Sequence, residues 1–122
     1  MYEPDFETFR RLAGEGNLIP LCREILADTE TPVTALMKLA ESPHVFLLES
    51  VEGGEKWARY SFLGSGPSHL FRSKGREFEI KKNGEILQKG ERKDPLRALE
   101  DFLGNYQPVV VDSLPRFFGG AV

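Results

Sequence analysis

Three stretches of the chain carry apolar residues at helical spacing, and each lies between start and stop signals: residues 6–13, 32–40 and 95–103. Asp5 and Thr31 precede the first two stretches as capping residues, and Asp94 precedes the third. Glycine or proline follows each stretch within three residues. The pattern therefore predicts three short helices. The apolar face of the third is expected to consist of Leu96, Leu99, Phe102 and Leu103.

Strands are predicted between and beyond these helices. Residues 18–25 are typical of an extended segment, and residues 46–48 form a continuous apolar run, which is typical of a strand covered on both faces. The clearest local signal is Asn83-Gly84, which separates two strand-like segments and predicts a two-residue hairpin turn. Phe78 and Ile80 alternate with charged residues, so one face of this hairpin is expected to be exposed to water.

Together these elements predict an α+β fold, with a mainly antiparallel sheet and about three packed helices. The second helix is expected to pack on the strand at residues 45–49. The sequence contains no internal repeat and no low-complexity linker, so a single unit over residues 1–122 is predicted. A chain of this length buries only about two thirds of its unfolded surface, so its margin of stability is expected to be thin.

Charge and composition narrow the possible partners. The net charge is -3 and the pI is near 5.4, which gives no electrostatic reason to expect a nucleic acid or an anionic membrane as partner. The sequence has no apolar run of about 18 residues, and its N-terminus lacks the pattern of a signal peptide. Cys22 is the only cysteine, so the chain has no internal disulfide. These features predict a cytoplasmic protein that binds a metabolite or another protein.

The residues around the apolar run at 46–48 are the best candidates for ligand chemistry. Glu49 and Ser50 end the predicted strand, where a carboxylate and a hydroxyl can receive an ammonium group. Arg59, on the predicted return strand, offers a planar donor fork to a carboxylate. Both charge signs on one strand pair suit a zwitterion such as an amino acid. The alternative is a structural ion pair with ordinary strand hydrogen bonds.

Other motifs give weaker signals. His44 and His69 lie apart without the partner spacing of a metal site, so no metal is expected there. The glycine-containing segment 64–68 lacks the Gly-Lys-Ser/Thr ending of a phosphate-binding loop and is interpreted as a turn. The basic residues of segment 74–93 are interleaved with glutamates, which favours a solvated hairpin over a nucleic-acid surface.

The sequence LLES at residues 47–50, followed by RYSFLG at residues 59–64, resembles a pattern of the anthranilate synthase component I family, which belongs to the chorismate-using enzymes. The segment PRFFGGAV at residues 115–122 is similar to the start of another pattern of that family. In order and spacing the resemblance covers essentially the whole chain. It implies that residues 1–122 form the N-terminal, tryptophan-sensing domain of a larger two-part α/β enzyme.

The resemblance also implies roles for particular residues. Tryptophan would bind in this domain as a feedback inhibitor, with Leu48 against the indole and with Glu49 and Ser50 at the amino-acid end. Arg59 or Tyr60 would supply the second polar wall, and Ser61 is a further candidate. No residue of this segment is assigned a catalytic role or a metal. Chorismate and magnesium would bind in the C-terminal half, and a glutamine amidotransferase would supply ammonia.

Two alternatives remain at this stage. The nearer one is the N-terminal domain of aminodeoxychorismate synthase component I, which holds tryptophan as a structural ligand. The other is a stand-alone small-molecule binding module.

Residues 108–122 are expected to be extended, and the chain stops on an apolar, strand-like segment. From this ending we expect the sequence to be part of a longer polypeptide. Because nothing in it resembles the family's chorismate site or its magnesium-binding carboxylates, we expect no lyase activity of its own.

Overall fold

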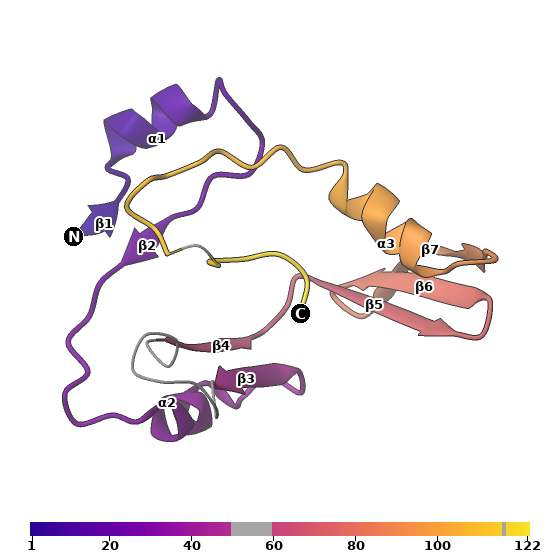
Figure 1. The fold of residues 1–122 in the computed structure, drawn as a ribbon, viewed down its shortest axis with the longest axis horizontal. Coiled ribbons are helices and arrows are strands. Elements are labelled where there is room, and N and C mark those ends of the chain that lie inside the picture. The colour runs from indigo at the N-terminus through magenta and orange to yellow at the C-terminus, as the bar shows by residue number, and fades with distance from the viewer. Residues whose placement is uncertain (50–59, 116) are drawn as a thin grey trace. The chain divides into compact units, whose positions relative to one another are not determined.

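The computed structural model describes residues 1–49, 60–115 and 117–122 (Figure 1). Its elements, in chain order, are β1 (Tyr2–Glu3), α1 (Phe6–Leu12), β2 (Cys22–Arg23), α2 (Pro32–Leu39), β3 (Val45–Glu49), β4 (Ser61–Ser65), β5 (His69–Lys74), β6 (Glu77–Lys82), β7 (Glu85–Glu91) and α3 (Leu96–Leu103). The predicted α+β class is confirmed. The strands form three small sheets, β1-β2, β3-β4 and β5-β6-β7.

Two compact units divide the chain. Unit 1 contains residues 1–25 and 71–121, and unit 2 contains residues 26–70 with Val122. Unit 1 therefore holds α1, α3 and the β6–β7 hairpin, whereas unit 2 holds α2 and the β3–β4 pair. The prediction that residues 1–122 act as one regulatory domain stays a prediction.

The first two helices begin where their capping residues place them. In α1 the side chain of Asp5 accepts a hydrogen bond from the backbone N–H of Thr8, at 2.8 Å. In α2 the hydroxyl of Thr31 accepts from the backbone N–H of Thr34, and the Thr34 hydroxyl accepts from the backbone N–H of Thr31. Each cap satisfies N–H groups that have no partner within the helix. Pro32 occupies the first position of α2, where a missing N–H costs nothing.

In unit 1 the segment after α1 is hydrogen-bonded to the segment after α3. The side chain of Asn17 donates to the carbonyl of Asn105 and accepts from the backbone N–H of Gln107. Gly16 permits this close approach, because a β-carbon at this position would lie 2.3 Å from the Gln107 carbonyl oxygen. Leu12 and Val109 are buried, so apolar packing accompanies the polar contact. Residues distant in sequence are thereby held together.

The β6–β7 hairpin forms around the predicted turn. Asn83 and Gly84 both have positive φ angles, 51° and 82°, which is the conformation that a tight hairpin turn of this type requires. Phe78 and Ile80 are buried, as the alternating pattern predicts. Leu87 has no partner in the register, because Ile80 pairs with Gln88 and the next residue pairs with Ile86. This bulge adds one residue to β7.

The predicted apolar face of α3 is only partly correct. Ala98 is the buried residue of this helix, and Leu99 and Phe102 are half-buried. Leu96, by contrast, is 63% exposed. The spacing identifies the helix, but the buried face depends on what the helix packs against. Arg92 is one such contact: its guanidinium pairs with Asp101 of α3 at 2.6 Å.

In unit 2, helix α2 packs on β3 and on β4, as predicted for the strand at residues 45–49. The two strands are antiparallel, with Phe46 opposite Gly64 and Leu48 opposite Phe62. The expectation that β3 is covered on both faces is wrong for the described residues, because Leu48 is 46% exposed and Val45 is exposed as well. A continuous apolar run shows that both faces can be buried, but it does not supply the second covering layer.

Candidate functional site

Four of the six predicted site residues lie at one end of the β3–β4 pair. Glu49 is the last residue of β3, and Ser61, the first of β4, stands directly opposite it. Leu48 precedes Glu49, and Tyr60 precedes Ser61. The structure therefore brings together residues that are separated by more than ten positions in the sequence. Ser50 and Arg59, the two remaining candidates, lie outside the described residues.

Strand alternation divides these four side chains between two faces. Residues directly opposite in an antiparallel pair share a face, so Glu49 and Ser61 lie on one side. Leu48 shares the other side with Phe62, its partner in the register. The ring of Tyr60 belongs to that second side, because its centroid is 6.2 Å from that of Phe62. One face thus carries Glu49 and Ser61, and the other carries Leu48 and the ring of Tyr60. Tyr60, which the resemblance offers as part of a polar wall, therefore has its ring on the apolar side.

The apolar candidates are accessible. Leu48 is 46% exposed and Tyr60 is 52% exposed, whereas Phe46 and Phe62, further along the same face, are half-buried. A row of apolar side chains therefore becomes more exposed toward the end that holds the candidate site. Phe46 and Phe62 were not among the residues predicted for the site. The signal was present in the period of two shared by residues 46 and 48 and by residues 60, 62 and 64.

The described residues give no support for a metal centre. Among them, no three His, Cys, Asp or Glu side chains lie in a group that could hold a metal ion. His69 instead has its ring Nδ1 2.9 Å from the hydroxyl of Ser68. Within the same part of the chain, no helix is long and apolar enough to cross a membrane.

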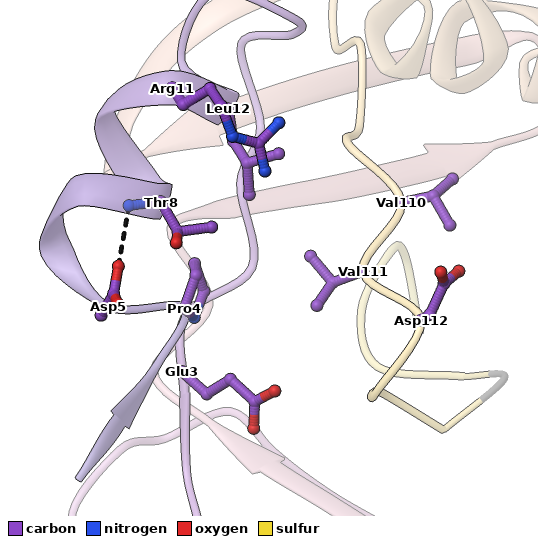
Figure 2. A pocket seen from close by; sticks show the side chains of 9 residues that line it. All are labelled: Glu3, Pro4, Asp5, Thr8, Arg11, Leu12, Val110, Val111 and Asp112. Atoms are coloured by element: carbon purple, nitrogen blue, oxygen red, sulfur yellow. Dashed lines mark hydrogen bonds between the residues drawn. The ribbon is translucent and has the colours of Figure 1, made fainter.

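A hollow of about 380 Å³ lies elsewhere, in unit 1, and Figure 2 shows α1 on one side of it and Val110–Asp112 on the other. Two of its polar side chains, Asp5 and Arg11, already have protein partners. Asp5 accepts the capping hydrogen bond from Thr8, and Arg11 pairs with Glu15 at 2.8 Å. None of the predicted tryptophan-site residues lines this hollow. We therefore assign no ligand to it.

The cap at the edge of this hollow predicts a pH dependence. Hydrogen bonding to Thr8 lowers the pKa of Asp5 below its ordinary value of 3.8. A carboxylate whose pKa is lowered on folding stabilises the folded state above its unfolded pKa, and this contribution is lost as the pH falls through the folded pKa. Asp5→Asn keeps a capping side chain that does not titrate. Wild type should therefore lose stability relative to D5N as the pH falls from neutral into the range below 3.8.

Urea unfolding midpoints of the two proteins, measured across this pH range, provide the test. Glu30 also has a lowered pKa, because Lys38 and Thr34 donate hydrogen bonds to it, so both proteins should weaken in acid. Only the difference between them reports on Asp5. Parallel curves for wild type and D5N would show that the Asp5 cap does not contribute.

Comparison with known proteins gives one consistent result. The chain is 41% identical over 117 residues to anthranilate synthase component 1 of Neisseria meningitidis, and 44% identical over 117 residues to the protein of that name from Pseudomonas aeruginosa. Each of these matches covers 95% of this chain. The protein of the same name from Acetivibrio thermocellus is 38% identical over 123 residues and covers all of it.

The share of the relatives that is matched is small. The chain spans 24% of the length of each of these three proteins, and the match falls in their N-terminal region. No protein-family model matches the chain, and no solved structure matches it significantly. The resemblance seen in the LLES and RYSFLG segments is thus confirmed by sequence identity that extends over 95–100% of this chain.

Proposed function

Over essentially its full length this chain is a homologue of the N-terminal region of anthranilate synthase component 1, and from this premise we propose that it is the tryptophan-sensing part of such an enzyme. The observation that carries the proposal is the meeting of Leu48, Glu49, Tyr60 and Ser61 at one end of the β3–β4 pair. Leu48 and Tyr60 offer an apolar surface, and Glu49 and Ser61, their neighbours in sequence, offer polar groups at the same end of the two adjacent strands. An amino acid with a large apolar side chain needs both.

The division between two faces restricts where the ligand lies. A molecule over either face of the strand pair would touch only one of the two sets of side chains. Tryptophan must therefore lie across the end of the ladder, beyond the Glu49–Ser61 pair, if it is to contact both. Ser50, which follows Glu49, and Arg59, which precedes Tyr60, are the remaining members of the proposed site. Indole would contact Leu48 and Tyr60, and the amino-acid end would contact Glu49, Ser50 and Arg59.

The proposed contacts are strong enough for a sensor. Burying an indole of about 200 Å² at about 25 cal/mol/Å² contributes roughly 5 kcal/mol before ordering costs. Hydrogen bonds to the charged ammonium and carboxylate contribute about 1.5–3 kcal/mol each. A ligand that lacks the charged groups, such as indole, leaves those partners unpaired and is discriminated against. Inhibition further requires that tryptophan bind one conformation of the enzyme better than another, by about 1–3 kcal/mol.

We place the chemical step outside these residues. In the proposal, the C-terminal part of the full-length protein binds chorismate and magnesium and acts as a lyase, and a glutamine amidotransferase subunit supplies ammonia. The 122 residues alone are then inactive. The proposal locates the enzyme in the cytoplasm and requires neither a nucleic acid nor a membrane as partner.

The test is to assay the full-length protein for conversion of chorismate to anthranilate, with ammonium as the nitrogen source and anthranilate fluorescence as the signal. We expect activity that tryptophan inhibits and that phenylalanine, which has the same charged groups and a smaller ring, inhibits far less. Activity without tryptophan inhibition would contradict the sensor role. Formation of aminodeoxychorismate would indicate the folate-branch sister enzyme, and no reaction with chorismate would indicate a binding module.

A further inference from the structure

The aromatic ring of Phe46 occupies the space that a side chain on Gly64 would need. The two residues are direct partners in the β3–β4 register. A β-carbon on Gly64 would lie 2.5 Å from Cε1 of Phe46 and 2.8 Å from its Cζ, distances that real β-carbons do not show. The ring therefore lies over the glycine, an arrangement that stabilises antiparallel strands where a glycine would otherwise weaken them.

This pair matters because the usual source of register is missing from these two strands. A strand with one apolar face is fixed in register, since a slip of one residue would expose that whole face. In β3 the apolar residues are consecutive, and in β4 Phe62 and Leu63 also lie on opposite faces. A slip would exchange one apolar residue for another. It would, however, bring the Phe46 ring against Leu63 or Ser65, the neighbours of Gly64.

We propose that the Phe46–Gly64 pair fixes the register of β3 and β4, and so positions Glu49 opposite Ser61 at the candidate site. The inference rests on the proposed function, because the positioned residues are those assigned to tryptophan. Phe46 and Gly64 each lie three residues from the Glu49–Ser61 pair, about 10 Å along the strands. Neither residue needs to touch the ligand. They are positioning residues, since binding sites lose affinity when their groups are held less accurately.

Gly64→Ala in the full-length protein tests the inference. The new methyl group should displace the ring or the strands, and raise the tryptophan concentration for half inhibition by about tenfold, which corresponds to about 1.4 kcal/mol. Each variant is compared with its own rate without tryptophan, so a change in total activity does not enter. Gly90→Ala is the matched control. Gly90 also faces a phenylalanine, Phe78, but in the other unit and with a milder approach of 3.2 Å.

A double-mutant cycle separates a displaced ring from a general disturbance. Phe46→Leu removes the ring atoms that the new methyl group would meet, so Gly64→Ala should have much less effect in the F46L background than in wild type. Gly90→Ala should change the half-inhibition concentration by no more than about twofold, because substitutions at distant, independent sites influence each other by no more than about that factor. If G64A does not fold, the F46L variant provides the test by itself. Loss of the ring should raise the tryptophan concentration for half inhibition by several fold, and an unchanged concentration would overturn the inference.

The outcomes distinguish the two proposals. If tryptophan inhibits wild type and G64A equally, or if G64A has the same effect in both backgrounds, the positioning role is overturned and the sensor role is unaffected. If tryptophan does not inhibit wild type, the sensor role is overturned, and the positioning role with it. A large effect of G64A that disappears in the F46L background supports both.

Discussion

Ser50→Ala in the full-length protein is expected to raise the tryptophan concentration for half inhibition by about ten- to a hundredfold, and Ser50→Arg is expected to raise it by more than a hundredfold. Family resemblance assigns Ser50 to the amino-acid end of the ligand, where its hydroxyl would bond to a charged group. Alanine removes that single charge-assisted hydrogen bond, which contributes about 1.5–3 kcal/mol. Arginine also introduces bulk and a positive charge beside the ligand's ammonium group, and like charges at close range are unfavourable.

A matched control lies on the same strand pair. Ser65 is the last residue of β4 and lies at the end of the strand pair away from the candidate site. It is exposed and stands opposite Val45. Ser65→Arg introduces the same side chain without approaching the proposed ligand, so its inhibition curve should coincide with that of wild type. The rate without tryptophan shows that each variant is folded. A curve for S50R that coincides with wild type would remove Ser50 from the site, and an equal effect of S65R would point to general damage of the sheet.

Features determined by a few neighbouring residues were predictable from the sequence. The Asn83-Gly84 turn was found because only residues that tolerate positive φ suit it, and both adopt such angles. The helix starts at Asp5 and Thr31 were found because capping is a contact between residues three positions apart. In each case the partners are local. The sequence therefore holds the whole of the relevant information.

Features determined by packing were not predictable in the same way. Leu96 fits the apolar stripe of α3 but is 63% exposed, whereas Ala98 is buried, because the buried face depends on the neighbouring elements. The end of the β3–β4 pair shows the same difference. Glu49 was predicted from its place at the end of an apolar strand, and Leu48, Tyr60 and Ser61 were predicted from the resemblance. Their division between two faces follows from the register that pairs Glu49 with Ser61.

The second large effect concerns the core of unit 1. Ile80→Ala is expected to lower the free energy of unfolding by about 2–5 kcal/mol, because Ile80 is only 1% exposed and the lost methylenes would leave a cavity. That loss is a large share of the total free energy of unfolding of a chain of this size, which is about 0.05–0.15 kcal/mol per residue. Urea unfolding at neutral pH provides the measurement. Ile80→Val, which removes one methyl group, should cost about 0.5–1.5 kcal/mol.

Ile86→Ala is the control for Ile80→Ala, since it makes the same chemical change on the same hairpin. Ile86 is 56% exposed and lies in β7 next to the bulge. Little of its side chain leaves water on folding, so its loss should change stability by no more than about 0.5 kcal/mol. Equal costs for I80A and I86A would show that β propensity, which both substitutions lower, outweighs burial in this hairpin. A cost several times larger for I80A would locate the stabilising apolar contacts of the β6–β7 hairpin on the face that carries Phe78 and Ile80.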